Sequence, residues 1–185
     1  MLEEVFEETT ERMKKSVEAT DRDFSRIRTG RPSPALLERI MVEAYGSKMP
    51  INQLATISVQ PPRTLVVRPF DRENLNAIER AVQMSDLGLT PGNDGKNIHM
   101  EIPPLTEERR KELVKVVRKK AEEGRVAVRS IRRDSREQIE MLQEEKEINE
   151  DEANKGMDMI QKITDEHIKK IDGILEKKEE EIMNF

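Results

Sequence analysis

The stretch Ile102–Leu113 reads IPPLTEERRKEL, and it separates two kinds of sequence. Short β-branched runs precede it, and apolar residues at helical spacing follow it. Two prolines end the preceding strand because proline has no backbone N–H to donate. Thr106 then offers a side-chain oxygen to a helix N-terminus, where Glu107 and Glu108 suit the positive end of the helix dipole. The stretch therefore predicts the end of a strand-containing segment and the start of a long helix.

Two long helices are predicted after this boundary. Apolar residues keep a heptad-like step to about Lys146, where INEDEA interrupts it and Asn149 is a candidate N-cap. Helices of about 30–40 residues would be roughly 45–60 Å long. Their apolar positions are Val114, Val117, Ala121, Val128, Ile131, Ile139 and Leu142, then Met157, Ile160, Ile163, Ile168, Ile171, Ile174, Leu175 and Ile182.

A third helix is predicted at the N-terminus, before TGRPSPALLE interrupts the pattern with a glycine and two prolines. No one amphipathic helix buries its own apolar stripe, so the three must pack together. Residues 1–29 and 106–185 therefore predict a long three-helix bundle. The N-terminal stripe includes two threonines and comprises Leu2, Phe6, Thr9, Met13, Val17, Thr20, Phe24 and Ile27.

Residues 30–105 differ from the rest and hold all nine prolines. Strands are predicted in RIMVEAY, ATISVQ, RTLVVRPF and NIHMEIP, with a turn at Pro61–Pro62. A helix is predicted in DRENLNAIERAVQMSD, with Asp71 as its N-cap. GNDG, at 92–95, is expected to be a turn. The whole chain thus predicts an α+β fold with a small β/α/β domain inserted into the bundle.

The insert joins the bundle through two chain crossings, and two short linkers make a hinge. We place this hinge at Thr29, Gly30 and Arg31 on one crossing and at Pro103, Pro104 and Leu105 on the other. The expected outline is a rod with a side domain, like an L. We expect a monomer, because three helices already cover each other's apolar stripes.

Composition excludes several classes of protein. The chain has no cysteine, so disulfides and thiolate sites are excluded. Its N-terminus lacks the basic and apolar regions of a signal peptide, and no apolar run is long enough to span a membrane. These features favour a cytoplasmic location. Charged residues make up 38% of the chain, against about 25% in typical soluble proteins.

Nothing in the sequence indicates an enzyme. His99 and His167 lie far apart, and no metal-binding HExxH motif, cysteine–histidine pair or glycine-rich phosphate loop occurs. The acids of DEANKGMD lack the spacing of a calcium-binding loop. His167 is interpreted as a helix-surface residue rather than a ligand. We therefore predict no catalytic residues, no metal and no cofactor.

Arginines concentrate in RVAVRSIRRDSR, residues 125–136, although the formal net charge of the chain is −5. On a helix that turns by about 100° per residue, these arginines lie roughly a quarter turn from the apolar positions. Lys111 falls in the same sector, and Arg110 lies off its edge. We call the following set the arginine ridge: Arg118, Arg125, Arg129 and Arg136 share the sector, and Arg132 and Arg133 flank it.

The arginine ridge has two interpretations. It is either a solvated face paired with glutamates or a surface for an anionic partner. Between Arg125 and Arg136 the only acid is Asp134, so the arginines repel each other. Arginine matches phosphate oxygens in two-point contacts, and the scarcity of aromatics argues against base stacking. We therefore favour backbone recognition of structured RNA. Gly124, beside the ridge, either permits close approach to RNA or is simply tolerated.

The chain resembles the bacterial ribosome recycling factor family along essentially its whole length. The stretches that carry the resemblance are IRTGRPSPALLERIMVEAYGS, FDRENLNAIERAVQMSDLGL, EIPPLTEERRKELVKVVRKKAEEGRVAVRSIRRDSR and IKKIDGILEKKEEEIMNF. The resemblance implies an L-shaped, tRNA-like fold of two domains joined by a hinge. It also implies that the factor works with elongation factor G and GTP on the 70S ribosome after peptide release, and that GTP hydrolysis belongs to the partner.

The resemblance further implies how the factor binds. The bundle would lie on the large subunit across the A and P sites, while the insert rotates about the hinge as the subunits split. Arginines that contact ribosomal RNA in the family match Arg110, Arg129 and Arg132 here. By proximity we extend this surface to Arg125, Arg133 and Arg136. A coiled-coil adaptor for protein partners remains the alternative, and it would not need the arginines for ribosome binding.

Overall fold

The computed structural model describes residues 1–184, which divide into two compact units. One comprises Met1–Thr29 and Thr106–Asn184, and the other comprises Gly30–Leu105. The first unit is helical and the second contains every strand found among the described residues. The predicted α+β class, with a strand-containing segment inserted between helices of a bundle, is confirmed.

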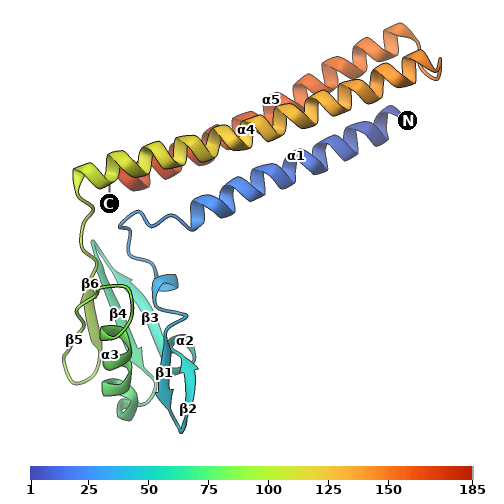
Figure 1. Cartoon of the computed structure of the whole chain (residues 1–185). Coiled ribbons are helices and arrows are strands. Elements are labelled where there is room, and N and C mark those ends of the chain that lie inside the picture. Colours follow the sequence, from blue (N-terminus) through green and yellow to red (C-terminus); the bar gives the residue numbers. More distant parts are fainter. Residues whose placement is uncertain (185) are drawn as a thin grey trace. The chain divides into compact units, whose positions relative to one another are not determined.

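The helical unit is a bundle of three helices, α1 (Leu2–Ser25), α4 (Glu107–Glu144) and α5 (Glu150–Asn184), which pack side by side (Figure 1). Thr106 caps α4 as predicted, since its Oγ1 accepts a hydrogen bond from the backbone N–H of Arg109 at 3.2 Å. Asn149 and Glu152 cap α5 reciprocally, each side chain accepting from the other's backbone N–H at 2.8 and 2.9 Å. Local capping therefore sets where both long helices begin.

The core of the bundle runs along the predicted stripes, with small residues where the helices approach closely. Ile139, Ile160 and Ile171 are fully buried. A Cβ atom added at Gly156 would lie 3.2 Å from Ile139 Cδ1, tighter than most real contacts. The predicted stripe of α4 omitted Leu113, Gly124 and Ser135, all of which are buried. Helix contact thus selects small residues as well as apolar ones.

The two threonines in the stripe of α1 are buried, and their hydroxyls are hydrogen-bonded. Thr9 Oγ1 donates to Val5 O at 2.6 Å and lies 2.6 Å from Ser135 Oγ of α4. Thr20 Oγ1 donates to Ser16 O at 3.0 Å and faces Gly124. The interpretation of Gly124 as a point of approach to RNA is therefore wrong, because the residue is buried inside the bundle.

The second unit combines a hairpin, a four-stranded sheet and one helix. Strands β1 (Met41–Ala44) and β2 (Ser47–Pro50) form the hairpin. The sheet is antiparallel throughout, and α3 (Leu75–Gln83) places Ile78 and Val82 in the core of this unit. The strand order in the sheet is β3 (Ala55–Gln60), β4 (Thr64–Pro69), β6 (Ile98–Glu101) and β5 (Gly92–Asn93).

Two features of this unit agree with the sequence, the turn at Pro61–Pro62 and the cap at Asp71. Gly92 and Asn93, which were expected to lie in a turn, form strand β5, and the elements β2, α2 (Ile51–Leu54) and the 3-10 turn Pro34–Leu36 were not predicted. Pro61–Pro62 forms the turn between β3 and β4 and has a cis peptide bond. Asp71 accepts from Glu73 N at 3.0 Å and so caps a 3-10 turn that leads into α3. Strands β2 and β5 and the helix α2 were missed because their sequences, SKMP, GN and INQL, contain neither a β-branched or aromatic run nor an extended apolar period.

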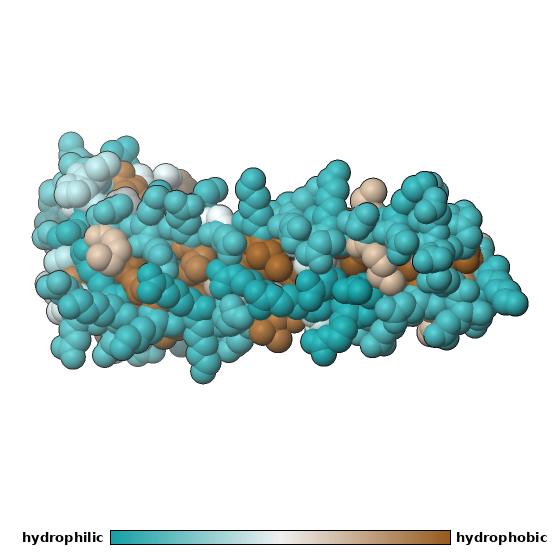
Figure 2. Space-filling view, turned by 90° about the horizontal axis from the view of Figure 1, so that it is seen from above, coloured by the Kyte–Doolittle hydropathy of each residue, from teal (hydrophilic) through white to brown (hydrophobic). Residues whose placement is uncertain are grey.

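The surface of the bundle is polar. In Figure 2, hydrophilic side chains cover most of the visible face, and hydrophobic residues show only as a broken band along it. Every helix of residues 1–184 is too polar or too short to traverse a lipid bilayer.

Candidate nucleic-acid interface

The arginine ridge lies along α4 beside α5. The buried positions of α4 face the other two helices, and the ridge arginines lie next to this buried face. Most are exposed or half-exposed, but the Arg125 side chain is only 20% exposed. The arginine ridge therefore lies where α4 and α5 meet, within reach of side chains from both helices.

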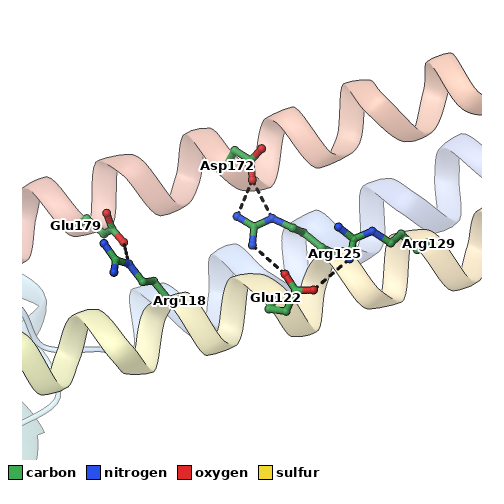
Figure 3. A network of polar contacts seen from close by, with 6 residues as sticks. All are labelled: Arg118, Glu122, Arg125, Arg129, Asp172 and Glu179. Carbon is green, nitrogen blue, oxygen red and sulfur yellow. Dashed lines mark hydrogen bonds and ion pairs between the residues drawn. The ribbon is translucent and has the colours of Figure 1, made fainter.

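The N-terminal half of the ridge is paired with carboxylates (Figure 3). Arg118 Nε donates to Glu179 Oε1 at 2.6 Å. Arg125 donates from Nε and Nη2 to Asp172 Oδ1, at 2.9 and 2.7 Å. Both acids belong to α5, so these contacts join the two long helices.

Glu122 links two further arginines within α4. Its Oε2 accepts from Arg125 Nη1 and its Oε1 from Arg129 Nη1, each at 3.1 Å. All three nitrogens of the Arg125 guanidinium are thus engaged. Arg129 is bound through Nη1 alone, so the edge formed by its Nε and Nη2 has no partner among residues 1–184. That edge is the one suited to a two-point phosphate contact.

This pairing shifts the titration of its members. Hydrogen bonds from Arg125 and then Arg129 hold the pKa of Glu122 below its usual range. The hydrogen bond to Glu179 raises the pKa of Arg118. Burial acts to lower the pKa of Arg125, but its bonds to Asp172 and Glu122 outweigh burial, and the pKa is raised. Each shift favours the charged form, so the network persists across physiological pH.

The C-terminal half of the ridge lacks such partners. Arg132 Nη1 reaches only the neutral Gln161 Oε1, at 3.4 Å. Arg133 and Arg136 form no ion pair or hydrogen bond through their side chains within residues 1–184. Asp134 is bound by Arg12 of α1 at 2.9 Å and does not neutralise them. Of the two interpretations of the ridge, pairing with carboxylates therefore applies to Arg118, Arg125 and Arg129, whereas no carboxylate within residues 1–184 pairs with Arg132, Arg133 or Arg136.

We call Arg132, Arg133 and Arg136 the cationic patch. Three positive charges within about one turn of a rigid helix repel each other and attract a polyanion. Because no carboxylate must be displaced from them, a phosphate contact here costs less than one with Arg118 or Arg125. The patch is therefore the part of the ridge best suited to RNA.

Arg110 lies apart from the other predicted RNA contacts. It is in the first turn of α4, and its Nη1 donates to the backbone carbonyl of Met183 near the end of α5. Eight residues of helix, about 12 Å, separate it from Arg118, the first arginine of the ridge, and fifteen, about 22 Å, from Arg125. The structure therefore does not bring Arg110 together with the ridge, and any contact it makes with RNA is a separate one.

The predicted hinge residues lie where the two compact units meet along the chain. Thr29 ends the first segment of the helical unit, where its Oγ1 donates to Glu181 Oε2 at 3.5 Å. Gly30 follows with a φ of +78°, a conformation that favours glycine. On the other crossing, Ile102 N donates to Arg63 O at 2.8 Å, and Pro103, Pro104 and Leu105 then lie outside helix and strand.

The two histidines are in different units. His167 is buried, and its Nδ1 donates to Ile163 O at 2.7 Å, so the prediction that it lies on the surface is wrong. His99 Nε2 lies 3.1 Å from Asp94 Oδ2. Throughout the described part of the chain, no three or more histidine, aspartate or glutamate side chains are grouped so that they could hold a metal ion.

The acids and the amide beside the ridge were missed from the sequence. Glu122 precedes Arg125 by three residues, so helix geometry alone indicated that pair. Asp172 and Glu179 are 47 and 61 residues from their arginines, and only the packing of α5 against α4 brings them near.

Known proteins are similar to this chain over its full length. The sequence pattern of the family described as ribosome recycling factor matches residues 20–183. The ribosome-recycling factor of Carboxydothermus hydrogenoformans is 52% identical over 185 residues, covering 100% of both chains. That of Syntrophomonas wolfei is 56% identical over 183 residues, covering 99% of each.

Two solved structures are also similar. The solution structure of a ribosome recycling factor has a TM-score of 0.71 and 44% identity, covering 100% of this chain and 98% of the other. The second is the T. thermophilus ribosome recycling factor, placed with E. coli elongation factor G on the E. coli post-termination complex. It has a TM-score of 0.64 and 49% identity, and the match covers 100% of each chain.

Proposed function

The chain belongs to the ribosome recycling factor family, and we propose that it binds the large ribosomal subunit across the A and P sites and, with elongation factor G and GTP, splits the post-termination complex. Splitting releases the messenger RNA and the transfer RNA. The protein is not itself an enzyme, since GTP hydrolysis belongs to elongation factor G. In this proposal the protein acts in the cytoplasm and as a monomer.

The full-length similarity to the T. thermophilus factor supports the choice of partners. That factor is 49% identical and was placed on a post-termination complex together with elongation factor G. Because the match covers all of both chains, the bundle and the insert are both available for the same task here. A match to the bundle alone would support ribosome binding but not splitting.

The cationic patch is the observation that carries the proposed contact with ribosomal RNA. Arg132, Arg133 and Arg136 have no carboxylate partner within residues 1–184. Arg129 adds the open edge of a guanidinium that Glu122 holds in place. Phosphate contacts of this kind position a protein on RNA without reading its bases. In this proposal Arg125 orients the surface, and Arg110 makes a second contact nearer the hinge.

The hinge supplies the second half of the proposed mechanism. With the bundle fixed on the large subunit, the insert rotates about Thr29–Arg31 and Pro103–Leu105 as elongation factor G moves against it. The two crossings carry the chain between units that each have their own core. Such a device transmits motion without weakening the contact of the bundle with RNA.

Co-sedimentation with isolated bacterial large ribosomal subunits tests the RNA contact. Arg132→Glu should weaken binding by more than tenfold and lower the salt dependence by about one unit of slope, because a phosphate contact is lost. Arg22→Glu is the matched control, since Arg22 is also exposed on a helix of the bundle and lies outside the ridge. Salt-insensitive binding that both variants leave unchanged would contradict the proposal and favour an adaptor for protein partners.

A further inference from the structure

The contacts between α4 and α5 follow a regular ladder. Arg118 pairs with Glu179, and Arg125, seven residues later, pairs with Asp172, seven residues earlier. The two helices are antiparallel, so a step of two turns forward on one matches two turns back on the other. The same step places Arg132 opposite Asp165. By residue type alone this third rung would be another arginine–aspartate ion pair.

The third rung is not an ion pair. Gln161, one turn before Asp165, donates from Nε2 to Asp165 Oδ1 at 2.8 Å. The Oε1 atom of the same amide accepts from Arg132 Nη1 at 3.4 Å, near the outer limit for a hydrogen bond. Across residues 1–184, neither Arg132 nor Asp165 takes part in an ion pair.

We propose that Gln161 is a positioning residue that occupies Asp165 and thereby keeps the charge of Arg132 available to a phosphate of ribosomal RNA. The inference rests on the proposed function, because it concerns how Arg132 reaches RNA. A side-chain amide suits this task, since it has a donor for the carboxylate and an acceptor for the guanidinium. A purely apolar side chain at 161 would leave Asp165 facing Arg132.

The missing ion pair at Arg132 matters because of what a phosphate would have to displace at each arginine of the ladder. Arg118 and Arg125 are bound to acids of α5 at 2.6–2.9 Å, and a phosphate would have to displace those carboxylates. At Arg132 the phosphate displaces only a long contact to a neutral amide. Arg132 also adjoins Arg133 and Arg136, so it adds a third available charge to the cationic patch. The ion pairs of Arg118 and Arg125 join α4 to α5, whereas Arg132, which forms no ion pair within residues 1–184, remains available for binding.

Replacing Gln161 tests this inference. Gln161→Ala releases Asp165, which can then pair with Arg132, so affinity for large subunits should fall roughly three- to tenfold with a smaller salt slope. Gln161→Ala combined with Asp165→Asn should restore wild-type affinity, because no carboxylate remains to compete. Gln143→Ala, at an exposed glutamine of α4, is the matched control. Helicity should be unchanged in all variants, since both glutamines are exposed.

Two outcomes would overturn the inference. One is wild-type affinity in Gln161→Ala. The other is a loss of affinity that Asp165→Asn does not restore, which would mean that the amide merely orients Arg132. Arg132→Glu, measured in parallel, distinguishes failure of the inference about Gln161 from failure of the proposed function. If Arg132→Glu binds weakly while Gln161→Ala binds normally, only the role of Gln161 is rejected; if both bind normally, the RNA contact itself is rejected.

Discussion

Gly124 of α4 lies against Thr20 of α1 so closely that a Cβ atom at position 124 would overlap the threonine Oγ1. The Cδ1 atom of Ile171, from α5, would lie 3.3 Å from the same Cβ. All three helices of the bundle therefore meet at this glycine. A residue that weakens an isolated helix is required here because it allows the helices to pack closely.

Gly124→Ala should destabilise the protein, although alanine favours helix by about 1 kcal/mol in an exposed site. Overpacking a buried site typically costs about 1–3 kcal/mol, and the buried Thr20 has little room to move. Gly173→Ala in α5 is the matched control, because a Cβ there meets nothing within 4 Å and should add up to about 1 kcal/mol of stability. Urea denaturation followed by helicity measures both. Equal effects of the two substitutions would contradict the packing argument.

Arg125 and Arg132 should separate stability from binding. Arg125 is mostly buried and bonded to two carboxylates, so Arg125→Ala should lower the free energy of unfolding by roughly 1–3 kcal/mol. Arg132→Ala removes only a long contact to Gln161 and should change stability by less than about 0.5 kcal/mol. Thermal unfolding measures the first effect and large-subunit binding the second. A stability loss in Arg132→Ala as large as that in Arg125→Ala would argue against this division of roles.

Because of Asp94, the free energy of unfolding of the second unit should vary with pH in the acid range. Its carboxylate accepts from the backbone N–H of Asn97 and of Lys96 and contacts His99, and these interactions hold its pKa well below the ordinary value of 3.8. A lowered pKa stabilises the folded state while the group is ionised. The contribution is therefore complete above about pH 5 and declines as the pH falls through and below 3.8.

Asp94→Asn should flatten this part of the pH profile. The only tyrosine of the chain, Tyr45, lies in the same unit, and there is no tryptophan, so tyrosine fluorescence reports the unfolding of this unit. Denaturant midpoints between pH 2.5 and 6 should differ most between wild type and variant at the upper end. Parallel profiles for the two proteins would show that the Asp94 carboxylate contributes nothing.

Loosening the hinge should reduce subunit splitting more than binding. Replacing Pro103 and Pro104 together by glycine removes two φ restraints from one crossing, so less of the motion of one unit is passed to the other. We expect splitting with elongation factor G and GTP to slow severalfold, while affinity for large subunits changes by less than about twofold. Thr90→Gly, at an exposed loop position within the second unit, is the control. A matching loss of affinity would place these prolines in the binding surface instead.

Much of the fold was predictable because its signals are local. The N-caps at Thr106 and Asn149 set the starts of α4 and α5 through hydrogen bonds that span three residues. The strands β3 and β4 were predicted from β-branched runs on either side of Pro61–Pro62. The elements β2 and α2 were not, since SKMP and INQL lack such a run and their pairing or packing depends on neighbours.

The candidate site was predictable only in part. Arginines at steps of four and seven on one helix must lie on one side of it, so the ridge followed from the sequence. The burial of His167 did not follow from the sequence, because an isolated histidine on an amphipathic helix does not indicate which neighbouring helix covers it. Nor did the partners of Arg118 and Arg125, which come from α5.

The long helices and their caps, the insertion of a strand-containing segment and the row of arginines could all be predicted from the amino-acid sequence. These properties depend on residues within a few positions of each other along the chain. Three features depend on tertiary packing: the ion pairs of Arg118 and Arg125 with acids of α5, the place of Gln161 between Arg132 and Asp165, and the role of Gly124 as a packing residue. The cause is packing between helices: the antiparallel register of α4 and α5 brings Arg118, Arg125 and Arg132 to residues 29 to 61 positions away, and α1 brings Thr20 against Gly124.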